Sequence, residues 1–414
     1  MSDRVDINML KREIENNLKS DNQIIKKIIK ELYKKPEIGG EEFFAKELIT
    51  KILRDHDFEI NENITNLPTA FIATSNYNNT EPNIAFLTEY DALPEIGHAC
   101  GHNASAAASI GAALALSECI KKWKINGTVY VIGTPGEENI GSKAILIKNG
   151  YFNNIDIAMM VHSYNYWLLD PKLFALNALE ITFKGKAAHA ANSPELGVNA
   201  LDALILIFNG ISCLRQQTKD RTRIHGIITK GGDIPGSIPE LTSAKIYVRA
   251  DESKYLENLT ERVKKCAYAA SIATGCKVSI KSFEEHTDGL VSNKILLNLF
   301  ENNLSKFVKK DSITISEEQM FGSSDVGNVS YCVPTIQPAN AIASQGINVH
   351  TPEFTRETIK EKALNNVIYS GYAMASTGLE IMVDENLLKL IKEEFKEATK
   401  DIKNNSNSNK SKKK

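Results

Sequence analysis

The sequence predicts an α/β protein in which a mainly parallel-sheet domain is interrupted by an inserted ferredoxin-like α+β domain. In the first part of the chain, short apolar runs of strand character alternate with helical patterns, as in a parallel sheet with crossover helices. A later stretch follows the order strand, helix, strand, strand, helix, strand, which is the order of a split βαβ unit. Polar side chains suited to chemistry directly follow several of the apolar runs.

The composition narrows the class of protein. The chain has 414 residues with 49 Lys+Arg and 51 Asp+Glu, and its length predicts about two or three domains. Its near balance of charge excludes the broad basic field of a dedicated nucleic-acid binder. The charged N-terminus lacks the apolar core of a secretory signal, and we expect no membrane-spanning run of roughly 18–20 apolar residues. Six scattered cysteines favour free thiols and a cytoplasmic location.

The first domain is expected to comprise residues 1–174 and 286–384. Two amphipathic helical patterns open it, and apolar strands and a helix of small residues follow. Its expected elements are helices over Asp6–Lys35 and Glu41–Asp57, a strand over Asn83–Glu89, a helix over Ala104–Ile120, and strands over Thr128–Thr134 and Ile155–Val161.

The inserted domain is expected over residues 175–285. Its elements are strands and helices over Leu179–Lys184, Val198–Arg215, Gly226–Lys230, Ala244–Ala250, Tyr255–Thr274 and Lys277–Phe283. Residues 385–414 are expected to form a C-terminal helix and a disordered tail of Lys, Asn and Ser. The tail lysines could contact RNA or an anionic surface, but a solubilising tail is the preferred interpretation.

Reactive side chains follow three consecutive strands of the expected parallel sheet. Open α/β sheets bind ligands at the carboxyl ends of their strands, so these side chains should converge at one edge. They are Asp91, Cys100, His102, the Glu137–Glu138 pair and His162.

Cys100 and His102 are candidate metal ligands. They are two residues apart, so an extended segment would direct both side chains the same way. The helix that follows would favour the thiolate through its N-terminal dipole. An isolated Cys-x-His would more often be a buried thiol beside a core histidine. Glu138 and His162 at the same edge favour a metal site instead, because thiolate, imidazole and carboxylate are zinc-type ligands.

The adjacent carboxylates Glu137 and Glu138 should point to opposite sides of an extended backbone. One could then bind metal while the other acts as general base on a water molecule. His350, late in the chain, could complete the site, although its spacing equally fits an ordinary loop histidine.

Seven motifs together carry a family resemblance, which covers about residues 21–379. They are Pro36–Glu42, Tyr90–Pro94, His98–Asn103, Gly133–Glu138, Gly185–Ala190, Gly322–Asp325 and His350–Phe354. With them the chain resembles the aminoacylase/carboxypeptidase family of two-metal peptidases, metallopeptidase family 20. It is most similar to the amidohydrolase branch that includes hippurate, indoleacetyl-amino-acid and aminobenzoyl-glutamate hydrolases, and to its dipeptidase-like members.

The resemblance implies a role for each of these residues. One or two divalent ions (Zn, Mn, Co or Ni) would be held, with Cys100 as the bridging ligand, and Glu137 would be the general base. The inserted domain would be a lid and dimerisation domain whose His189 reaches a partner's active site and stabilises the oxyanion. Asp91 and His98 would support the ligands without binding metal. The implied ligands are Cys100, His102, Glu138, His162 and His350.

One position departs from the family pattern. The lid loop, represented here by residues 231–239, usually carries an asparagine, and this chain has Gly236 there. A polar contact to the substrate is therefore missing or is supplied by a neighbour such as Ser237. Arg249 could pair with a substrate carboxylate, and a structural salt bridge is an equally good interpretation.

These residues predict a metal-dependent amidohydrolase that cleaves the amide between an acyl or aminoacyl group and an amino acid. A dipeptidase acting on free-amine substrates is the alternative within enzymes. A catalytically idle, metal-binding dimeric scaffold is the alternative from another class, and the intact Glu137 argues against it. The expected partners are a small N-acyl amino acid or dipeptide and a second copy of the chain bound through the lid domain, with no nucleic acid and no membrane.

Overall fold

The computed structural model describes residues 6–62, 64–316 and 322–400, and the chain divides into two units. Unit 1 comprises Met1–Pro171, Val291–Glu318 and Asn328–Lys414, and unit 2 comprises Lys172–Leu290 and Gln319–Gly327. Unit 2 is longer at both ends than the expected insertion 175–285, and it gains a segment that was expected in the first domain. The C-terminal helix α12 (Glu385–Ala398) belongs to unit 1. The predicted disordered tail falls mostly at residues 401–414, outside the described residues.

Unit 1 begins with three helices, α1 (Ile7–Ser20), α2 (Asn22–Lys34) and α3 (Phe43–Asp55). The single helical pattern expected over Asp6–Lys35 is therefore two helices. Asp21 interrupts it with φ −83° and ψ 3°, and it is both the C-cap of α1 and the N-cap of α2. The apolar faces of both helices are buried, which explains why one continuous amphipathic pattern covers them.

The main sheet of unit 1 has six strands in the order β1-β2-β4-β3-β5-β13. Strands β4, β3, β5 and β13 pair in parallel, whereas β1 and β2 pair antiparallel. The sheet is therefore mixed, with a parallel part that carries the expected strands. Their bounds are β1 Glu59–Asn61, β2 Phe71–Tyr77, β3 Asn83–Thr88, β4 Gly127–Gly133, β5 Ile157–Met159 and β13 Thr335–Ile336.

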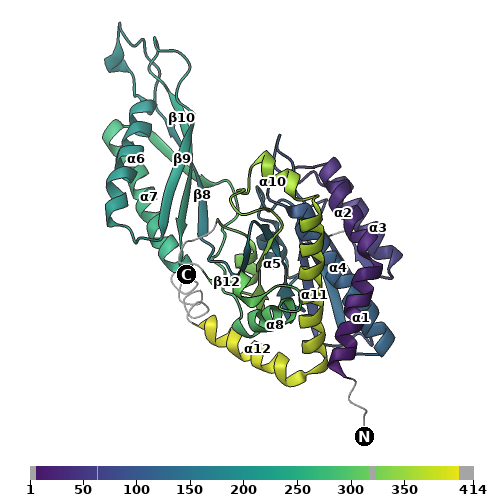
Figure 1. Ribbon diagram of the computed structural model, residues 1–414. Helices are drawn as coiled ribbons and strands as arrows, with labels where there is room; N and C mark the ends of the chain where they lie inside the picture. The colour runs from purple at the N-terminus through teal and green to yellow at the C-terminus, as the bar shows by residue number, and fades with distance from the viewer. Residues whose placement is uncertain (1–5, 63, 317–321, 401–414) are drawn as a thin grey trace. The chain divides into compact units, whose positions relative to one another are not determined.

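The core helix of unit 1 is α4 (His102–Trp123), which packs against α1, α2 and α11 (Glu361–Val383) (Figure 1). Its small residues allow close approach: a Cβ at Gly111 would lie 2.9 Å from Ile25 Cδ1. Contrary to the expectation from the sequence, α4 is long and apolar enough to cross a membrane, but 94% of that stretch is buried within the protein.

The other elements of unit 1 surround this core. A small sheet has the order β12-β7-β14-β6, and its first strand in the chain, β6, begins at His162. The bounds are α5 Ser142–Lys148, β6 His162–Tyr164, β7 Trp167–Asp170, α8 Lys294–Leu304, β12 Ile313–Ser316, β14 Ala339–Ala341 and α10 Pro352–Glu357; the short helix α9, Val326–Val329, lies across the boundary of the two units.

Unit 2 contains the element order that the sequence predicted for the insertion. Its four strands form one antiparallel sheet in the order β11-β8-β10-β9, the arrangement of a ferredoxin-like unit. Alternate residues of β10 are buried in a core shared with α6 and α7. The bounds are β8 Ala175–Lys184, α6 Ala200–Leu214, β9 Thr222–Lys230, β10 Leu241–Ala250, α7 Ser253–Thr274 and β11 Lys277–Ser282.

Candidate metal centre

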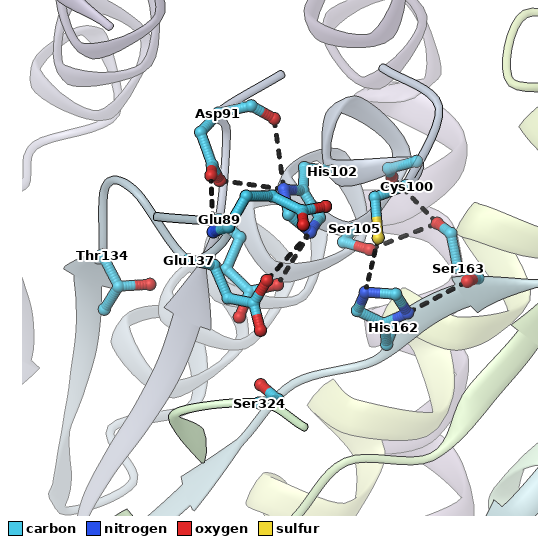
Figure 2. A network of polar contacts seen from close by, with 12 residues as sticks. Glu89, Asp91, Cys100, His102, Ser105, Thr134, Glu137, His162, Ser163 and Ser324 are labelled. Atoms are coloured by element: carbon cyan, nitrogen blue, oxygen red, sulfur yellow. Dashed lines mark hydrogen bonds and ion pairs between the residues drawn. The ribbon is translucent and has the colours of Figure 1, made fainter. Parts of the chain in front are cut away.

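The parallel strands β4, β3 and β5 end at the same edge of the main sheet. Asp91 follows β3, the Glu137–Glu138 pair follows β4, and His162 comes three residues after the end of β5. His102 is the first residue of α4. Figure 2 shows these side chains directed toward one another. His162 was expected at the end of the third strand, and it is instead the first residue of β6 in the small sheet.

The structure brings all five expected ligands together within unit 1. Their potential ligand atoms fall into overlapping groups of three, and within each group these atoms lie within 4.8 Å of one another. The Cys100 Sγ is 3.5 Å from His162 Nε2, and His350 Nε2 is 3.4 Å from a Glu138 oxygen. The groups are Cys100–His102–His162, Cys100–Glu138–His350 and His102–Glu137–Glu138.

These donors suit a divalent cation. The Nε2 atom of His102 and the Oε1 atom of Glu138 are buried and make no hydrogen bond within the described structure. Buried polar atoms are normally satisfied, so a bound ion supplies what the protein does not. The set of one thiol, three imidazoles and a carboxylate matches borderline metals such as zinc.

Cys100 and His102 converge for a different reason from the expected one. The segment is not extended: Gly101 has φ 76°, and its amide donates to the His98 carbonyl at 3.0 Å. A Cβ at Gly101 would lie 2.4 Å from the Cβ of Ser163. The left-handed turn and the close approach both require glycine, and this glycine aligns the thiol with the first residue of α4.

The helix does not make Cys100 a thiolate, as the sequence had suggested. Burial, with help from Glu138, raises the pKa of the Cys100 thiol well above its ordinary value, and His102 offsets this only in part. The thiol is therefore protonated until a cation displaces the proton, so metal binding at this centre releases protons.

Asp91 holds two parts of the site. Its Oδ1 is 2.8 Å from His102 Nδ1, and its Oδ2 accepts a hydrogen bond of 3.0 Å from the Glu138 amide. With Nδ1 directed to the carboxylate, Nε2 of His102 is the atom left for a metal. The other expected supporting residue, His98, is buried, and burial followed by the charge of His102 lowers its pKa to about 3. It is therefore neutral at pH 7.

Glu42 supports the site, although its motif suggested no role for it. It is fully buried, and its Oε1 accepts a hydrogen bond of 2.7 Å from the amide of Gly136, next to Glu137. Its Oε2 accepts from Thr69 Oγ1 and from the Gly40 amide, each at 2.8 Å. Burial raises the pKa of Glu42 to about 7, against the lowering effect of Thr69.

A buried ion pair adjoins the ligands. Lys143 Nζ lies 2.6 Å from Glu89 Oε1, and Glu89 Oε2 lies 3.5 Å from His102 Nε2. Both side chains of the pair are fully buried. Burial alone would raise the pKa of Glu89, but Lys143, His102 and His162 outweigh it and lower the pKa. Glu89 was visible in the sequence at a strand end, but no local pattern indicated that Lys143 would be buried.

The remaining expected residues lie in unit 2. His189 is exposed, and its backbone pairs with that of Ser237 in an antiparallel bridge. The Gly236 carbonyl accepts a hydrogen bond from the Ala190 amide at 3.0 Å, so this loop is tied to the loop of His189. Arg249 ends β10 and donates to Ser323 Oγ at 2.7 Å. Its guanidinium also lies over the ring of Tyr247 at 5.3 Å.

Nitrogen, sulfur and carboxylate donors at the carboxyl edge of an α/β sheet, with a further carboxylate beside them, define a metal-dependent hydrolase. The chain belongs to peptidase family M20/M25/M40, whose model matches residues 85–370. The family predicted from the sequence motifs is therefore confirmed.

Individual relatives agree with this assignment. The Xaa-Arg dipeptidase of Mus musculus is 38% identical over 319 residues, which cover 76% of this chain and 73% of the relative. A p-aminobenzoyl-glutamate hydrolase from Escherichia coli strain K12 is 26% identical and covers 94% of this chain and 95% of its own. A dinuclear metal-binding M20 peptidase from Bacillus subtilis has a similar fold, with a TM-score of 0.65 and 20% identity over 87% of this chain and 99% of its own.

Proposed function

We propose that this enzyme hydrolyses the amide bond of aminoacyl or acyl amino acids at a centre held by Cys100, His102, Glu138, His162 and His350. The observation that carries the proposal is the overlap of the three ligand groups at the end of strands that belong to one sheet. When bound, one or two divalent ions would polarise the substrate carbonyl and lower the pKa of a water molecule.

Glu137 is the proposed general base. Its side chain is 9% exposed, and its carboxylate lies 4.0 Å from His102 Nε2, at the border of the ligand cluster. In this role its carboxylate accepts a proton from the attacking water and then delivers it to the leaving amine. Glu42 holds the preceding peptide through Gly136, and Asp91 holds the following amide. Both contacts would fix where the Glu137 carboxylate points.

Dipeptides are the substrate class that we propose testing first. The 38% identical relative is named an Xaa-Arg dipeptidase, which supports a free-amine aminoacyl substrate with a cationic C-terminal residue. The similarity to a p-aminobenzoyl-glutamate hydrolase supports N-acyl amino acids as the second class. In either case Arg249 and Ser237 of unit 2 are the proposed contacts to the substrate.

His189 is the proposed oxyanion donor. Its Nδ1 accepts hydrogen bonds from the backbone amides of Ala191 and Asn192, at 3.3 and 3.1 Å. A neutral imidazole that accepts at Nδ1 carries its proton on Nε2. The loop therefore favours the tautomer that can donate to a developing negative charge.

We further propose that unit 2 forms the homodimer contact. The edge strand β9 exposes Ile227 and Ile228, and helix α6 exposes Ile205 and Leu206. An unpaired strand edge with apolar side chains favours pairing with a second copy. Light scattering should find a dimer, and Ile227→Lys should shift the protein toward the monomer.

The test of the function is an assay of metal-free and reconstituted enzyme. Purified protein would be stripped with a chelator, reloaded separately with Zn, Mn, Co and Ni, and assayed on Xaa-Arg dipeptides and N-acyl amino acids. We expect hydrolysis of at least one class to return with metal. If no metal binds, or if no member of either class is hydrolysed in any metal form, the proposal is wrong.

A further inference from the structure

A second group of possible metal ligands lies in unit 1, remote from the centre described above. Asp21 joins α1 to α2, His56 directly follows α3, and Glu118 lies in α4. One ligand atom from each residue falls within 4.8 Å of the other two. Glu118 is sixteen residues beyond His102 on the same helix, which separates the two groups by about 24 Å along α4.

The distances suit a small divalent cation. His56 Nδ1 lies 3.3 Å from Glu118 Oε1. Two ligands that are each about 2.1 Å from a tetrahedral zinc ion lie about 3.4 Å apart. The separation of these two atoms is therefore that of neighbouring zinc ligands, and it is long for a direct hydrogen bond between a nitrogen and an oxygen.

Asp21 points independently to a ligand. Its side chain is 95% buried (5% exposed), and its Oδ2 has no hydrogen-bond partner within the described structure. Although Asp21 is the N-cap of α2, its side chain does not cap that helix. Burial, and then the charge of Glu118, raise the pKa of Asp21 to about 6, while His56 lowers it only in part. A buried carboxylate beside a second carboxylate is costly unless a cation compensates for it.

We infer that Asp21, His56 and Glu118 form a second divalent-cation site that serves structure rather than catalysis. Two carboxylates and an imidazole are a donor set that zinc accepts, and the side chain of Glu118 is 41% exposed, which leaves room for a water as fourth ligand. The ion joins the α1–α2 junction to the ends of α3 and α4, four helical segments that otherwise meet through apolar packing.

The test measures zinc stoichiometry in the full-length protein. Equilibrium dialysis against buffered free Zn²⁺, followed by elemental analysis, would compare wild type with Asp21→Asn and Glu118→Gln. Each variant should bind one ion fewer per chain than wild type, whatever number the catalytic centre holds. Both should keep wild-type turnover, since neither residue is in the catalytic machinery. Glu13→Gln on α1, which removes the carboxylate paired with Lys122 at 2.8 Å, is the matched control and should bind as wild type does.

A second readout covers the case in which one variant folds poorly. Zn²⁺ should raise the unfolding temperature of a variant whose catalytic ligand His162 is replaced by alanine, and adding Glu118→Gln should remove part of that increase. Unchanged stoichiometry in both Asp21→Asn and Glu118→Gln would overturn the inference. The same holds if Asp21→Asn stabilises the protein equally with and without zinc, because Asp21 would then be only a buried carboxyl that prefers to be protonated.

Discussion

The Glu42 carboxylate accepts a 2.7 Å hydrogen bond from the backbone amide of Gly136, ninety-four residues further along the chain. Gly136 precedes Glu137, so the contact connects the start of α3 to the loop that carries the proposed base. Because Glu42 also binds Thr69 and the Gly40 amide, one buried side chain joins three separate segments behind the metal centre.

Replacing Glu42 by glutamine should change how stability depends on pH. The pKa of Glu42 is raised from 4.5 to about 7 in the folded protein, so unfolding releases a proton between these values. Its contribution to the free energy of unfolding is complete below about pH 4.5 and is lost as the pH rises through about 7. Glu42→Gln should lack this decline.

Denaturant unfolding of the metal-loaded protein at several pH values between 4 and 8 (roughly the range set by linkage) would measure the effect. Glu41→Gln is the control, since Glu41 is exposed and adjacent. Identical pH slopes for wild type and Glu42→Gln would contradict the prediction.

Glu137→Gln should lower kcat roughly 10²–10⁴-fold, the usual contribution of a general base. The amide keeps the size of the side chain but cannot accept the proton from water. Bound metal, measured by elemental analysis, should stay near the wild-type level, whereas Glu138→Gln should reduce it. Near-normal turnover in Glu137→Gln would remove that residue from the base role.

Asp91→Asn should weaken metal binding or activity by about 10–100-fold. Asparagine cannot accept from both His102 and the Glu138 amide, so one of the two loses its orientation. Competition with a chelator would give the metal affinity. Asp156→Asn is a suitable control because Asp156 also accepts from a backbone amide, that of Asn83 at 2.8 Å, away from the metal centre. Equal losses in both variants would mean that the effect is not specific to the centre.

Gly101→Ala should destabilise the protein more than Gly275→Ala does. Both glycines have φ 76°, so alanine incurs the left-handed cost of about 1–2 kcal/mol at either position. Only at Gly101 does the new Cβ meet another residue at 2.4 Å; at Gly275 the nearest atom is at 3.9 Å. We expect an additional loss of at least about 1 kcal/mol in the free energy of unfolding, together with loss of bound metal.

His189→Ala should lower kcat without reducing the metal content. The residue lies in unit 2, outside the ligand groups of unit 1, and its proposed role is donation to the oxyanion. Loss of one such donor costs about 10²–10³ in kcat. Steady-state kinetics on the best substrate from the screen would measure it, and unchanged kcat would rule out the role.

Local patterns were sufficient for most of the secondary structure. The strand expected over Asn83–Glu89 is β3, and the helix expected over Tyr255–Thr274 is α7 with two more residues. They were predictable because each depends on the periodicity of its own side chains. The division of the first pattern at Asp21 was not predicted, because the apolar stripe is nearly continuous across the break.

Contacts between distant segments are what the sequence could not provide. Five ligands were identified because metal-binding residue types are rare and occur here at strand ends. The partners of those residues are common: Glu42 is one of many glutamates and Lys143 one of many lysines. Their importance arises from full burial beside the centre, which depends on how helices and strands pack.

The sequence by itself determined the family, the alternation of strands and helices, and the ligand types, since these depend on residue identity and local spacing. The tertiary structure decided which side chains meet. Gly101 turns the chain so that Cys100 and His102 converge, and the packing of α1–α4 brings Asp21, His56 and Glu118 within reach of one ion. The reason is physical: the energetic effect of a charged side chain depends on its burial and its neighbours, and both are set by the folded chain.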